Sequence, residues 1–579
     1  MPEAPIRLRT RRVMGQEIEF GVTHAEEAQR ARAGANASIQ LSHFTVGAYA
    51  LLEDSDRERV RWDYGDETPL RDARGFELTR AAAHPTQLTD QGQDAHVPSV
   101  DMDLPLAAHE SIPRDLDDSA VLHFAQRRAI GNAVLRNGAR LYVDHAHPEY
   151  SAPETMTARE CLVWDRAGEE IARAALARID GADTVPSIAL YKNNTDGKGQ
   201  SYGTHENYLV DRAVPFDRLV EVLLPFFTTR QVLVGSGRVG LGTRGQEPGF
   251  QLSSRADFFE SEVALETTLN RPIVNSRDEP HSDASRFRRL HVIIGDANLF
   301  ETPNYLKTGM TSLVLAAAEA EQATGEAILP DIRLADPVAA LHRVSHDLTL
   351  REDLECADGS AITALGIQRA YLDAVAAHAD VGDAETADVI GQWRELLDIL
   401  ESDDRAAAAD RIEWLGKHTL LESFRARHGL EWDDPRLTAL DIQFTDLRPA
   451  KSLYLKLRGA GRARTLVSDD EVRRAMVEAP TSTRAYLRGA LVTHHRSELD
   501  SAGWDAVTIK DDGAALRLRF SDPRFGSQAW CADNGVDPSA PVEAIIAAAR
   551  AIETQPATAE TPTSHNEPPT RPAGAKEEQ

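Results

Sequence analysis

Apolar and polar residues recur with two different periods along this sequence, and each period predicts a different kind of element. Apolar residues at helical spacing predict long helices at Tyr305–Ala323, Ile362–His378, Thr386–Leu400 and Asp404–His418. Alternating apolar and polar residues predict strands at Val13–Val22, Ala139–Asp144, Ser187–Tyr191, Gly249–Arg255 and Leu290–Ile294. Because the two kinds of element alternate irregularly and no fixed repeat is found, we expect an α+β fold.

A separate small unit is predicted near the C-terminus. Trp504–Lys510 and Ala514–Phe520 have strand-like patterns and are joined by Asp-Asp-Gly, a sequence typical of hairpin turns. Ala540–Ile552 has the pattern of a helix. We therefore expect a large domain over residues 1–492 and a small α+β domain over residues 493–553.

Two segments lack the apolar residues that a packed core needs. Residues 554–579 contain no Val, Ile, Leu, Met, Phe, Trp, Tyr or Cys, and this composition predicts a disordered tail. A second stretch, at about 77–122, is polar and has no steady period over most of its length. Loops of that length are usually functional or disordered, so we expect a mobile loop inside the large domain.

Charge and composition exclude several classes of protein. The chain has 579 residues, with 64 Lys+Arg against 92 Asp+Glu and a formal net charge of −28, which argues against binding to nucleic acid. No apolar run approaches the roughly 18 residues of a membrane span, and no apolar signal core follows the basic N-terminal segment. The three cysteines lie far apart, which fits a reducing compartment. We expect a cytoplasmic protein that binds neither nucleic acid nor membrane.

Three of the predicted strands combine an apolar face with an unusual polar face. The polar residues are Glu17 and Glu19 in the first strand, Arg140, Tyr142 and Asp144 in the second, and Gln251, Ser253 and Arg255 in the third. One interpretation is that these polar residues form the solvent-exposed face of an amphipathic sheet. However, these positions carry no Lys, and the first strand places two carboxylates roughly 7 Å apart. Such carboxylates favour a cation site.

The residues after the second strand extend this site. DHAHPEYSAPE, at 144–154, adds two His and two Glu in a turn stiffened by Pro. Zinc is an alternative, but the sequence has no HExxH motif and no cysteine nearby. Hard carboxylate oxygens favour Mg²⁺, which commonly bridges carboxylates and nucleotide phosphates.

Two further groups suit an anionic ligand. KNNTDGKGQSYGTHENY, at 192–208, has Gly and Asn residues that let the backbone turn tightly and approach a ligand, although a hairpin turn explains DGKG equally well. No GxxxxGK[ST] is present, so a P-loop is excluded.

The second group is basic, and Arg binds phosphate and carboxylate in a bidentate fork. It comprises Arg238, Arg255, Arg271, Arg277, Arg286, Arg288 and Arg289, followed by His291.

Together these residues predict an open sheet whose concave face holds Mg²⁺, a nucleotide and an acidic or amide-bearing substrate. Asp144 is the remaining carboxylate, at a strand end beside His and Arg. It is the candidate general base or nucleophile.

Six segments resemble the bacterial family that acts on Pup, the small disordered protein tag that marks substrates for the bacterial proteasome. They are MGQEIEFGV, NGARLYVDHAHPEYSAPE, YKNNTDGKGQSYGTHENYL, GFQLSSRAD, NSRDEPHSDASRFRRLHVIIGDAN and TRAYLRG. The resemblance runs from about Arg11 to about Arg550. The family has two branches, the Pup–protein ligase and the deamidase/depupylase of Pup (Dop).

Two features favour the deamidase/depupylase branch. RWDY at 61–64, followed by PLRDARGF and the long loop, is similar to the depupylase, whose loop near the active site the ligase lacks. The turn that begins at Asp144 is one residue shorter than in the ligase.

The resemblance implies a glutamine-synthetase-like fold, in which a curved antiparallel sheet forms a cradle with helices behind it and a small C-terminal domain is attached. It implies ATP (or ADP) and Mg²⁺ in the cradle, and Asp144 matches the catalytic aspartate. We assign Glu17, Glu19, Tyr142, Glu149, His205 and His291 to metal sites. We assign Arg140, Ser151 (or Ala152), Arg255, Arg277 and Trp504 to the nucleotide, with Trp504 reaching in from the C-terminal domain.

The activity implied is hydrolysis at the C-terminus of Pup. One substrate is a C-terminal Gln, deamidated to Glu, and the other is the isopeptide bond between Pup and a target lysine. The nucleotide is expected to be required without stoichiometric consumption. The implied partners are Pup, pupylated proteins and the proteasomal ATPase. Because Pup is acidic in this family, we expect it to bind a locally basic groove in the region 238–289.

Three other functions are weighed against this one. A Pup–protein ligase would consume ATP to form the isopeptide bond. A non-enzymatic nucleotide-binding scaffold would lack the carboxylates that this chain retains. A ligase of the glutamate–cysteine type would turn over ATP with small amines and would not depend on Pup.

Overall fold

The computed structural model describes residues 6–34, 36–52, 60–65, 67–78, 116–511 and 514–553. The expected tail at 554–579 lies outside these residues, as does most of the expected loop at about 77–122. The end of that expected loop is helical, since α4 (Asp118–Arg127) begins after Asp117, whose side chain accepts a hydrogen bond from the N–H of Ala120.

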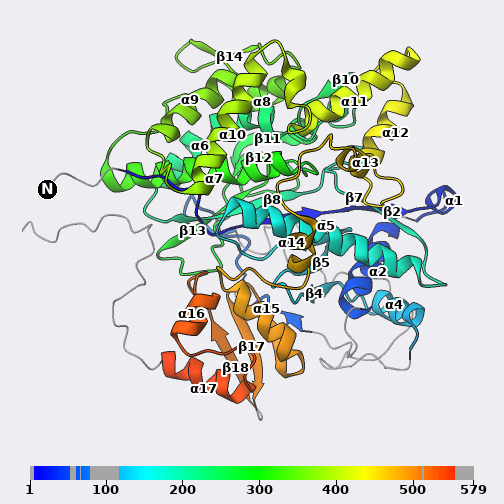
Figure 1. Ribbon diagram of the computed structural model, residues 1–579, viewed down its shortest axis with the longest axis vertical. Coiled ribbons are helices and arrows are strands. Elements are labelled where there is room, and N and C mark those ends of the chain that lie inside the picture. The colour runs from blue at the N-terminus through cyan, green and yellow to red at the C-terminus, as the bar shows by residue number, and fades with distance from the viewer. Residues whose placement is uncertain are drawn as a thin grey trace, which may run out of the picture.

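A six-stranded antiparallel sheet forms the centre of the large domain (Figure 1). Its order is β13 (Phe287–Val292), β8 (Thr204–Asp211), β1 (Met14–Glu19), β6 (His147–Ser151), β5 (Arg140–Asp144) and β4 (Asn132–Val134). The strand predicted at Val13–Val22 is divided into β1 and β2 (Gly21–His24), and β2 pairs with β7 (Ile188–Tyr191) in a separate two-stranded ribbon. The expected α+β fold and antiparallel sheet are thus confirmed.

Helices cover the apolar face of the sheet. They are α2 (Ala37–Leu52), α5 (Ala158–Asp180), α6 (Phe216–Val234) and α7 (Glu301–Thr324). Ile18, Leu141 and Tyr150 point to this face and pack in one core with residues of α2 and α5. Tyr208 and Leu290 pack in a second core with α6 and α7. The opposite face of the sheet is thereby left to its polar side chains.

Further helices pack outside these, including α8 (Pro337–His346), α9 (Ala364–Ala377), α10 (Ala384–Glu401) and α12 (Pro435–Phe444). The helices predicted for the α7, α9 and α10 segments are confirmed. The single helix predicted at Asp404–His418 is wrong, because a 3₁₀ turn at Arg405–Ala408 is followed by a new helix, α11 (Glu413–His428). Glu413 turns inward there and accepts hydrogen bonds from the N–H groups of Leu299 and Phe300.

The C-terminal unit contains a four-stranded sheet with the order β18 (Ala514–Arg519), β17 (Ala506–Asp511), β16 (Leu499–Ala502) and β3 (Arg61–Trp62). It also contains α15 (Ala485–His494), α16 (Gln528–Asp533) and α17 (Val542–Glu553), and it lies below the large domain in Figure 1. Its core includes Val60, Trp62, Leu487 and Leu491. The unit expected from residue 493 therefore also uses α15 and a strand from the N-terminal part of the chain.

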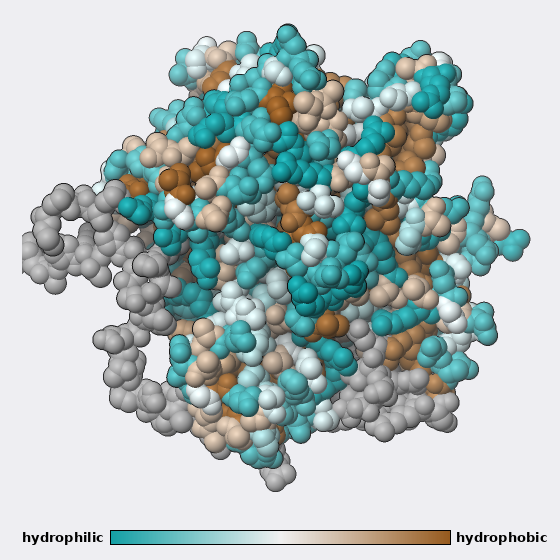
Figure 2. All heavy atoms as spheres, in the orientation of Figure 1, coloured by the Kyte–Doolittle hydropathy of each residue, from teal (hydrophilic) through white to brown (hydrophobic). Residues whose placement is uncertain are grey.

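The surface of the molecule is mainly hydrophilic on the face shown in Figure 2, with scattered apolar patches. In the described part of the chain, no helix is both long and apolar enough to cross a bilayer.

Glu154 joins the C-terminal unit to the large domain. Its carboxylate accepts a hydrogen bond from Arg484 Nε at 2.8 Å and pairs with Arg488, and both arginines are buried. Arg488 also donates to the carbonyl oxygen of Trp504 at 3.0 Å. Burial raises the pKa of Glu154, but the charges of Arg488 and Arg484 outweigh burial and lower this pKa to about 2.

We expect Glu154→Gln to lower the free energy of unfolding by about 3–5 kcal/mol at neutral pH, because two buried guanidinium groups lose their counter-charge. Urea unfolding of the purified variant measures this loss. The stabilisation is present above the ordinary carboxyl pKa of 4.5 and is lost as the pH falls through about 2, so the difference between the proteins should shrink in acid. Glu471→Gln is the matched control, since Glu471 pairs with Arg159 at the surface and should contribute no more than about 1 kcal/mol. Equal losses in the two variants would contradict the role given to Glu154.

Candidate active site

The open face of the sheet gathers most of the residues that the sequence assigns to the site. Residues directly opposite one another in an antiparallel sheet point to the same face. The register places Arg140 opposite Ser151, Ser151 opposite Glu17, and Glu17 opposite His205. A second row joins Tyr142, Glu149 and Glu19, and Asp144 is opposite His147 at the sheet edge. His291, opposite Asn207, completes the same face.

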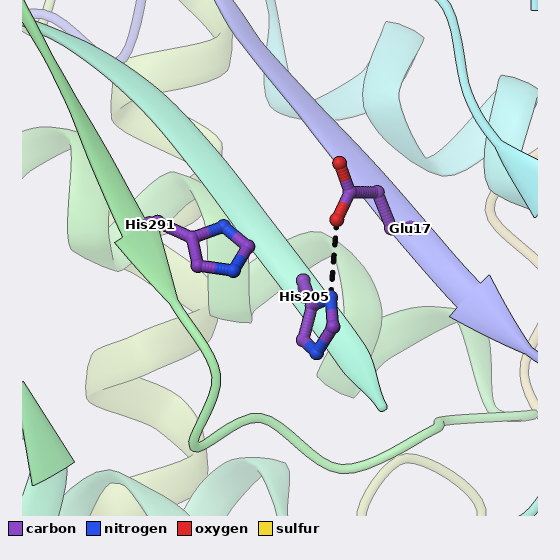
Figure 3. Close-up of side chains that lie close together, drawn as sticks. All are labelled: Glu17, His205 and His291. Atoms are coloured by element: carbon purple, nitrogen blue, oxygen red, sulfur yellow. Dashed lines mark hydrogen bonds and ion pairs between the residues drawn. The ribbon is translucent and has the colours of Figure 1, made fainter. Parts of the chain in front are cut away.

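Glu17, His205 and His291 form an imidazole cluster at the centre of this face. Nδ1 of His205 lies 3.0 Å from Oε2 of Glu17, as Figure 3 shows, and the two imidazole rings are 4.9 Å apart. Nδ1 of His291 donates to Oδ1 of Asn207 at 2.9 Å, because an amide oxygen can only accept. This bond leaves Nε2 of His291 with its lone pair. Burial and the charge of Arg289 hold the pKa of His291 well below its usual value, so the ring is neutral.

Glu19, Asp144 and Glu149 form a carboxylate cluster next to it. Burial and the charges of Asp144, Glu19 and Glu17 raise the pKa of Glu149 well above its ordinary value. Burial also raises the pKa of Asp144, but a hydrogen bond from Nδ1 of His145, with an Nδ1–Oδ2 distance of 2.7 Å, and the charges of His145, His205 and Arg140 together outweigh burial and lower this pKa. Asp144 is therefore ionised at neutral pH, whereas the pKa of Glu149 is shifted in the opposite direction.

The two clusters have the donor atoms of divalent cation sites. In each cluster, one ligand atom from every residue lies within 4.8 Å of the others. The carboxylate cluster offers hard oxygen atoms, which suit Mg²⁺, and the imidazole cluster adds neutral nitrogen atoms. The pKa of Glu149 is raised in part because the neighbouring carboxylates repel its negative charge. A bound cation would relieve this repulsion.

A pocket adjoins the imidazole cluster where β1 begins. It is lined by Gly15, Glu17, Asn207, His281, Arg484 and Trp504, among others. Trp504 comes from the turn between β16 and β17, so the C-terminal unit supplies one wall of this pocket. The pocket can receive a flat group next to a charged one, because an indole ring and arginines line it together.

The arginines assigned to the nucleotide have different surroundings. Arg140 lies on the open face, with its guanidinium 3.8 Å from the ring centroid of Tyr142. The charge of Arg277 acts on both Glu17 and His291, which places this side chain beside the imidazole cluster. Arg255 instead is buried below the Glu19 end and donates to the carbonyl oxygens of Ile293 and Gly295. Burial and the charge of Arg271 lower the pKa of Arg255 to about 9.

One expectation about this region is wrong. The segment at Gly249–Arg255 is not a third strand of the open sheet, because β10 (Glu247–Gln251) pairs with β9 (Arg238–Leu241), and Gln251, Ser253 and Arg255 are buried. The basic groove expected in the region 238–289 stays a prediction. Arg238, Arg271 and Arg288 are buried and bond to Asp257 or to backbone carbonyl oxygens, whereas Arg286 is exposed.

Sequence reasoning did not assign Asn207, Trp62 or Tyr64 to the site, although RWDY at 61–64 was used to distinguish the two branches of the family. Asn207 orients His291 and Arg289, and its alternation with His205 on β8 is a signal that could have found it. Trp62 and Tyr64 lie beside Arg140 although 76 or more residues separate them in the sequence, and no local pattern predicts that contact.

The curved antiparallel sheet with acidic, imidazole and guanidinium groups on its open face is the architecture of the glutamine-synthetase-like fold. The chain belongs to the Pup-ligase protein family, which matches it over residues 12–508. It is 44% identical over 523 residues to a Pup deamidase/depupylase of Mycobacterium tuberculosis, covering 90% of this chain and 95% of the relative. It is 38% identical over 428 residues to a Pup–protein ligase of Acidimicrobium ferrooxidans, covering 72% of this chain and 92% of the relative.

Solved structures agree with this assignment. The crystal structure of the complex between Pup and its ligase PafA superposes with a TM-score of 0.69 at 26% identity and covers 94% of both chains. A structure of the ligase PafA in complex with ADP gives a TM-score of 0.65 at 30% identity and covers 76% of this chain and 98% of that one.

Proposed function

We propose that this protein is a nucleotide- and Mg²⁺-dependent hydrolase of amide bonds at the C-terminus of Pup. It deamidates a C-terminal Gln and cleaves the isopeptide bond between Pup and a target lysine. The observation that carries the proposal is the ionised Asp144, held by His145 within the carboxylate cluster. The similarity over 90% of the chain to a protein named Pup deamidase/depupylase supports the same reaction.

Asp144 acts on the carbonyl carbon of the scissile amide in this proposal. Its carboxylate either attacks that carbon or takes a proton from a water molecule that attacks it. The carbon–nitrogen bond breaks, and the nitrogen leaves as ammonia or as the lysine amine after it gains a proton from water or from the protonated Asp144. Where Asp144 itself attacks the carbon, a water molecule then hydrolyses the resulting acyl anhydride and frees its carboxylate. Both substrates contain the same carboxamide, so one carboxylate serves both.

The open face holds the other groups that the reaction needs. Glu19 and Glu149, with Tyr142 beside them, and Glu17, His205 and His291 would bind divalent cations. When bound, Mg²⁺ neutralises nucleotide phosphates and polarises the substrate carbonyl. Trp504 and the pocket at the start of β1 would receive the nucleotide base. Arg140 and Ser151, which lie opposite each other on the open face, and Arg277 would face its charged part. Arg255, which is bound to backbone carbonyl oxygens, would act mainly by shaping the floor of the site.

Mass spectrometry of Pup tests the proposal. Purified protein with Mg²⁺ and ATP is mixed with Pup ending in Gln, and separately with a Pup–protein conjugate. Deamidation replaces an amino group with a hydroxyl group, so Pup should gain about one mass unit by attack on the amide carbon. Release of the free target is expected from the conjugate. If neither change occurs, while Pup ending in Glu is joined to a lysine-bearing protein with formation of ADP, the protein is a ligase.

A further inference from the structure

We propose that Tyr64 and Trp62 are positioning residues for Arg140, and that through them the C-terminal unit holds this guanidinium ready for an anionic ligand. The ligand chemistry is that of a nucleoside diphosphate or triphosphate. The inference rests on the proposed function for the identity of this ligand. The inference adds Tyr64 and Trp62 to the site. These residues do not touch the reacting atoms; they hold Arg140, which binds the ligand.

Tyr64 fixes Arg140 by hydrogen bonding. Its hydroxyl oxygen accepts a hydrogen bond from Nη2 of Arg140 at 2.9 Å and one from Nδ2 of Asn132 at 2.7 Å. Nε of Arg140 donates to Oδ1 of the same Asn132 at 3.1 Å. The three side chains thus form a closed set of bonds that sets both the direction and the rotation of the guanidinium plane.

Trp62 fixes the same group by stacking. The guanidinium carbon of Arg140 lies 4.3 Å from the ring centroid of Trp62 and 3.8 Å from that of Tyr142. Both distances are within the range of cation–π attraction. On its other side, Trp62 packs edge-to-face against Trp504, with the ring centroids 4.9 Å apart. A continuous stack therefore runs from the C-terminal unit to Tyr142 on the open face.

The backbone that carries these two residues is anchored to the C-terminal unit. β3 pairs in parallel with β16, and the N–H of Asp63 donates to the carbonyl oxygen of Ala502 at 2.9 Å. Arg61 pairs with Asp500 at 2.6 Å, and Asp63 pairs with Arg517. The backbone of Tyr64 is therefore held by the C-terminal sheet, while its hydroxyl group reaches Asn132 and Arg140 of the cradle.

Arg140 retains its charge for a ligand. Within the described residues, its guanidinium is hydrogen-bonded to neutral groups and stacked on aromatic rings, with no carboxylate at ion-pair distance. Its side chain is buried on the same face as the carboxylate cluster. A buried cation that is fixed in direction but has no counter-ion fits the binding of a phosphate group.

The test compares ADP binding by the full-length protein and by Tyr64→Phe, using calorimetry without Pup. We expect the dissociation constant for ADP to rise about tenfold, because a hydrogen bond to a charged donor is lost. In the hydrolysis assay, the KM for the nucleotide should rise similarly and kcat at saturating nucleotide should change less than about twofold. Tyr371→Phe is the matched control, since it removes a buried hydroxyl group that donates to Val222 far from the site. It should leave ADP binding unchanged.

A second comparison shows whether Tyr64 acts through Arg140. In an Arg140→Lys background, Tyr64→Phe should change ADP affinity by less than about twofold, because the fork that Tyr64 orients is absent. Unchanged ADP affinity in Tyr64→Phe overturns the inference, and so does a full tenfold effect in the Arg140→Lys background. Failure of the wild-type protein to cleave Pup, with ADP binding still weakened in Tyr64→Phe, would refute the proposed function and leave this inference standing.

Discussion

Asp144→Asn is expected to lower the rates of Pup deamidation and depupylation together by about 10³-fold or more, because it removes the carboxylate charge that we propose acts as base or nucleophile on the amide carbon. The change keeps the size of the side chain. Arg140, Trp504 and the imidazole cluster are untouched by it, so ADP binding should stay within about threefold of wild type. Initial rates on both substrates, measured at saturating nucleotide, give the result.

The control for this experiment is Asp353→Asn, on the exposed strand β14 (Asp353–Glu355) away from the sheet. It makes the same change of charge and should leave both rates near wild type. Asp144→Asn would contradict the assignment if it kept more than about a tenth of the wild-type rate, since a group acting in the transition state contributes more than this. A loss of deamidation alone would mean that the two reactions use different groups.

Glu149→Gln is expected to abolish activity and yet to stabilise the metal-free protein. The buried carboxylate of Glu149 is crowded by Asp144, Glu19 and Glu17, and an amide at this position removes the repulsion. In EDTA the variant should be more stable than wild type by about 1 kcal/mol. Mg²⁺ should raise the unfolding temperature of wild type and have little effect on the variant.

The stability of the metal-free protein should also depend on pH through Glu149. Because the folded-state pKa of Glu149 is raised above its ordinary value of 4.5, the contribution of this group to stability is fully present below that pH. It is lost as the pH rises through the folded-state pKa, and Glu149→Gln should lack this loss. Binding of a cation displaces the proton, so Mg²⁺ affinity should rise with pH.

Glu154→Gln is the comparison that shows whether the expected stabilisation is specific to the position of Glu149. Glu149 and Glu154 are both acidic residues buried near the sheet, but one faces carboxylates and the other faces two arginines. The same substitution should therefore have opposite effects on the metal-free protein. If Glu149→Gln also destabilises in EDTA, or if it responds to Mg²⁺ as wild type does, then Glu149 does not belong to a cation site.

The alternation of side chains along strands predicted much of the site. Glu17 and Glu19 share a face in the structure, as do Arg140, Tyr142 and Asp144, because the period of two is a property of the backbone and does not depend on the partner strand. The pairing of these strands with each other could not be predicted in this way. It depends on the helices behind the sheet, which come from other parts of the chain.

The failures have identifiable physical causes. Helix α5 was not predicted, and its inward face includes Asp165 and Glu169, which pair with the buried Lys192. Gln251, Ser253 and Arg255 have the spacing of an exposed polar face, but hydrogen bonds to buried partners such as Asp257 and Asp296 let them point inward. Hydropathy alone cannot distinguish a polar side chain in water from one with a buried partner.

The ratio of ADP formed to Pup released, measured in one reaction on a Pup–protein conjugate, tests the central claim most directly. In the proposed function, Asp144 hydrolyses an amide, a downhill reaction that needs the nucleotide only as a bound group. We therefore expect many Pup molecules to be released for each ADP formed, and no release without nucleotide. Formation of one ADP for each Pup joined to a lysine, with no release from the conjugate, would contradict it and identify the protein as a ligase.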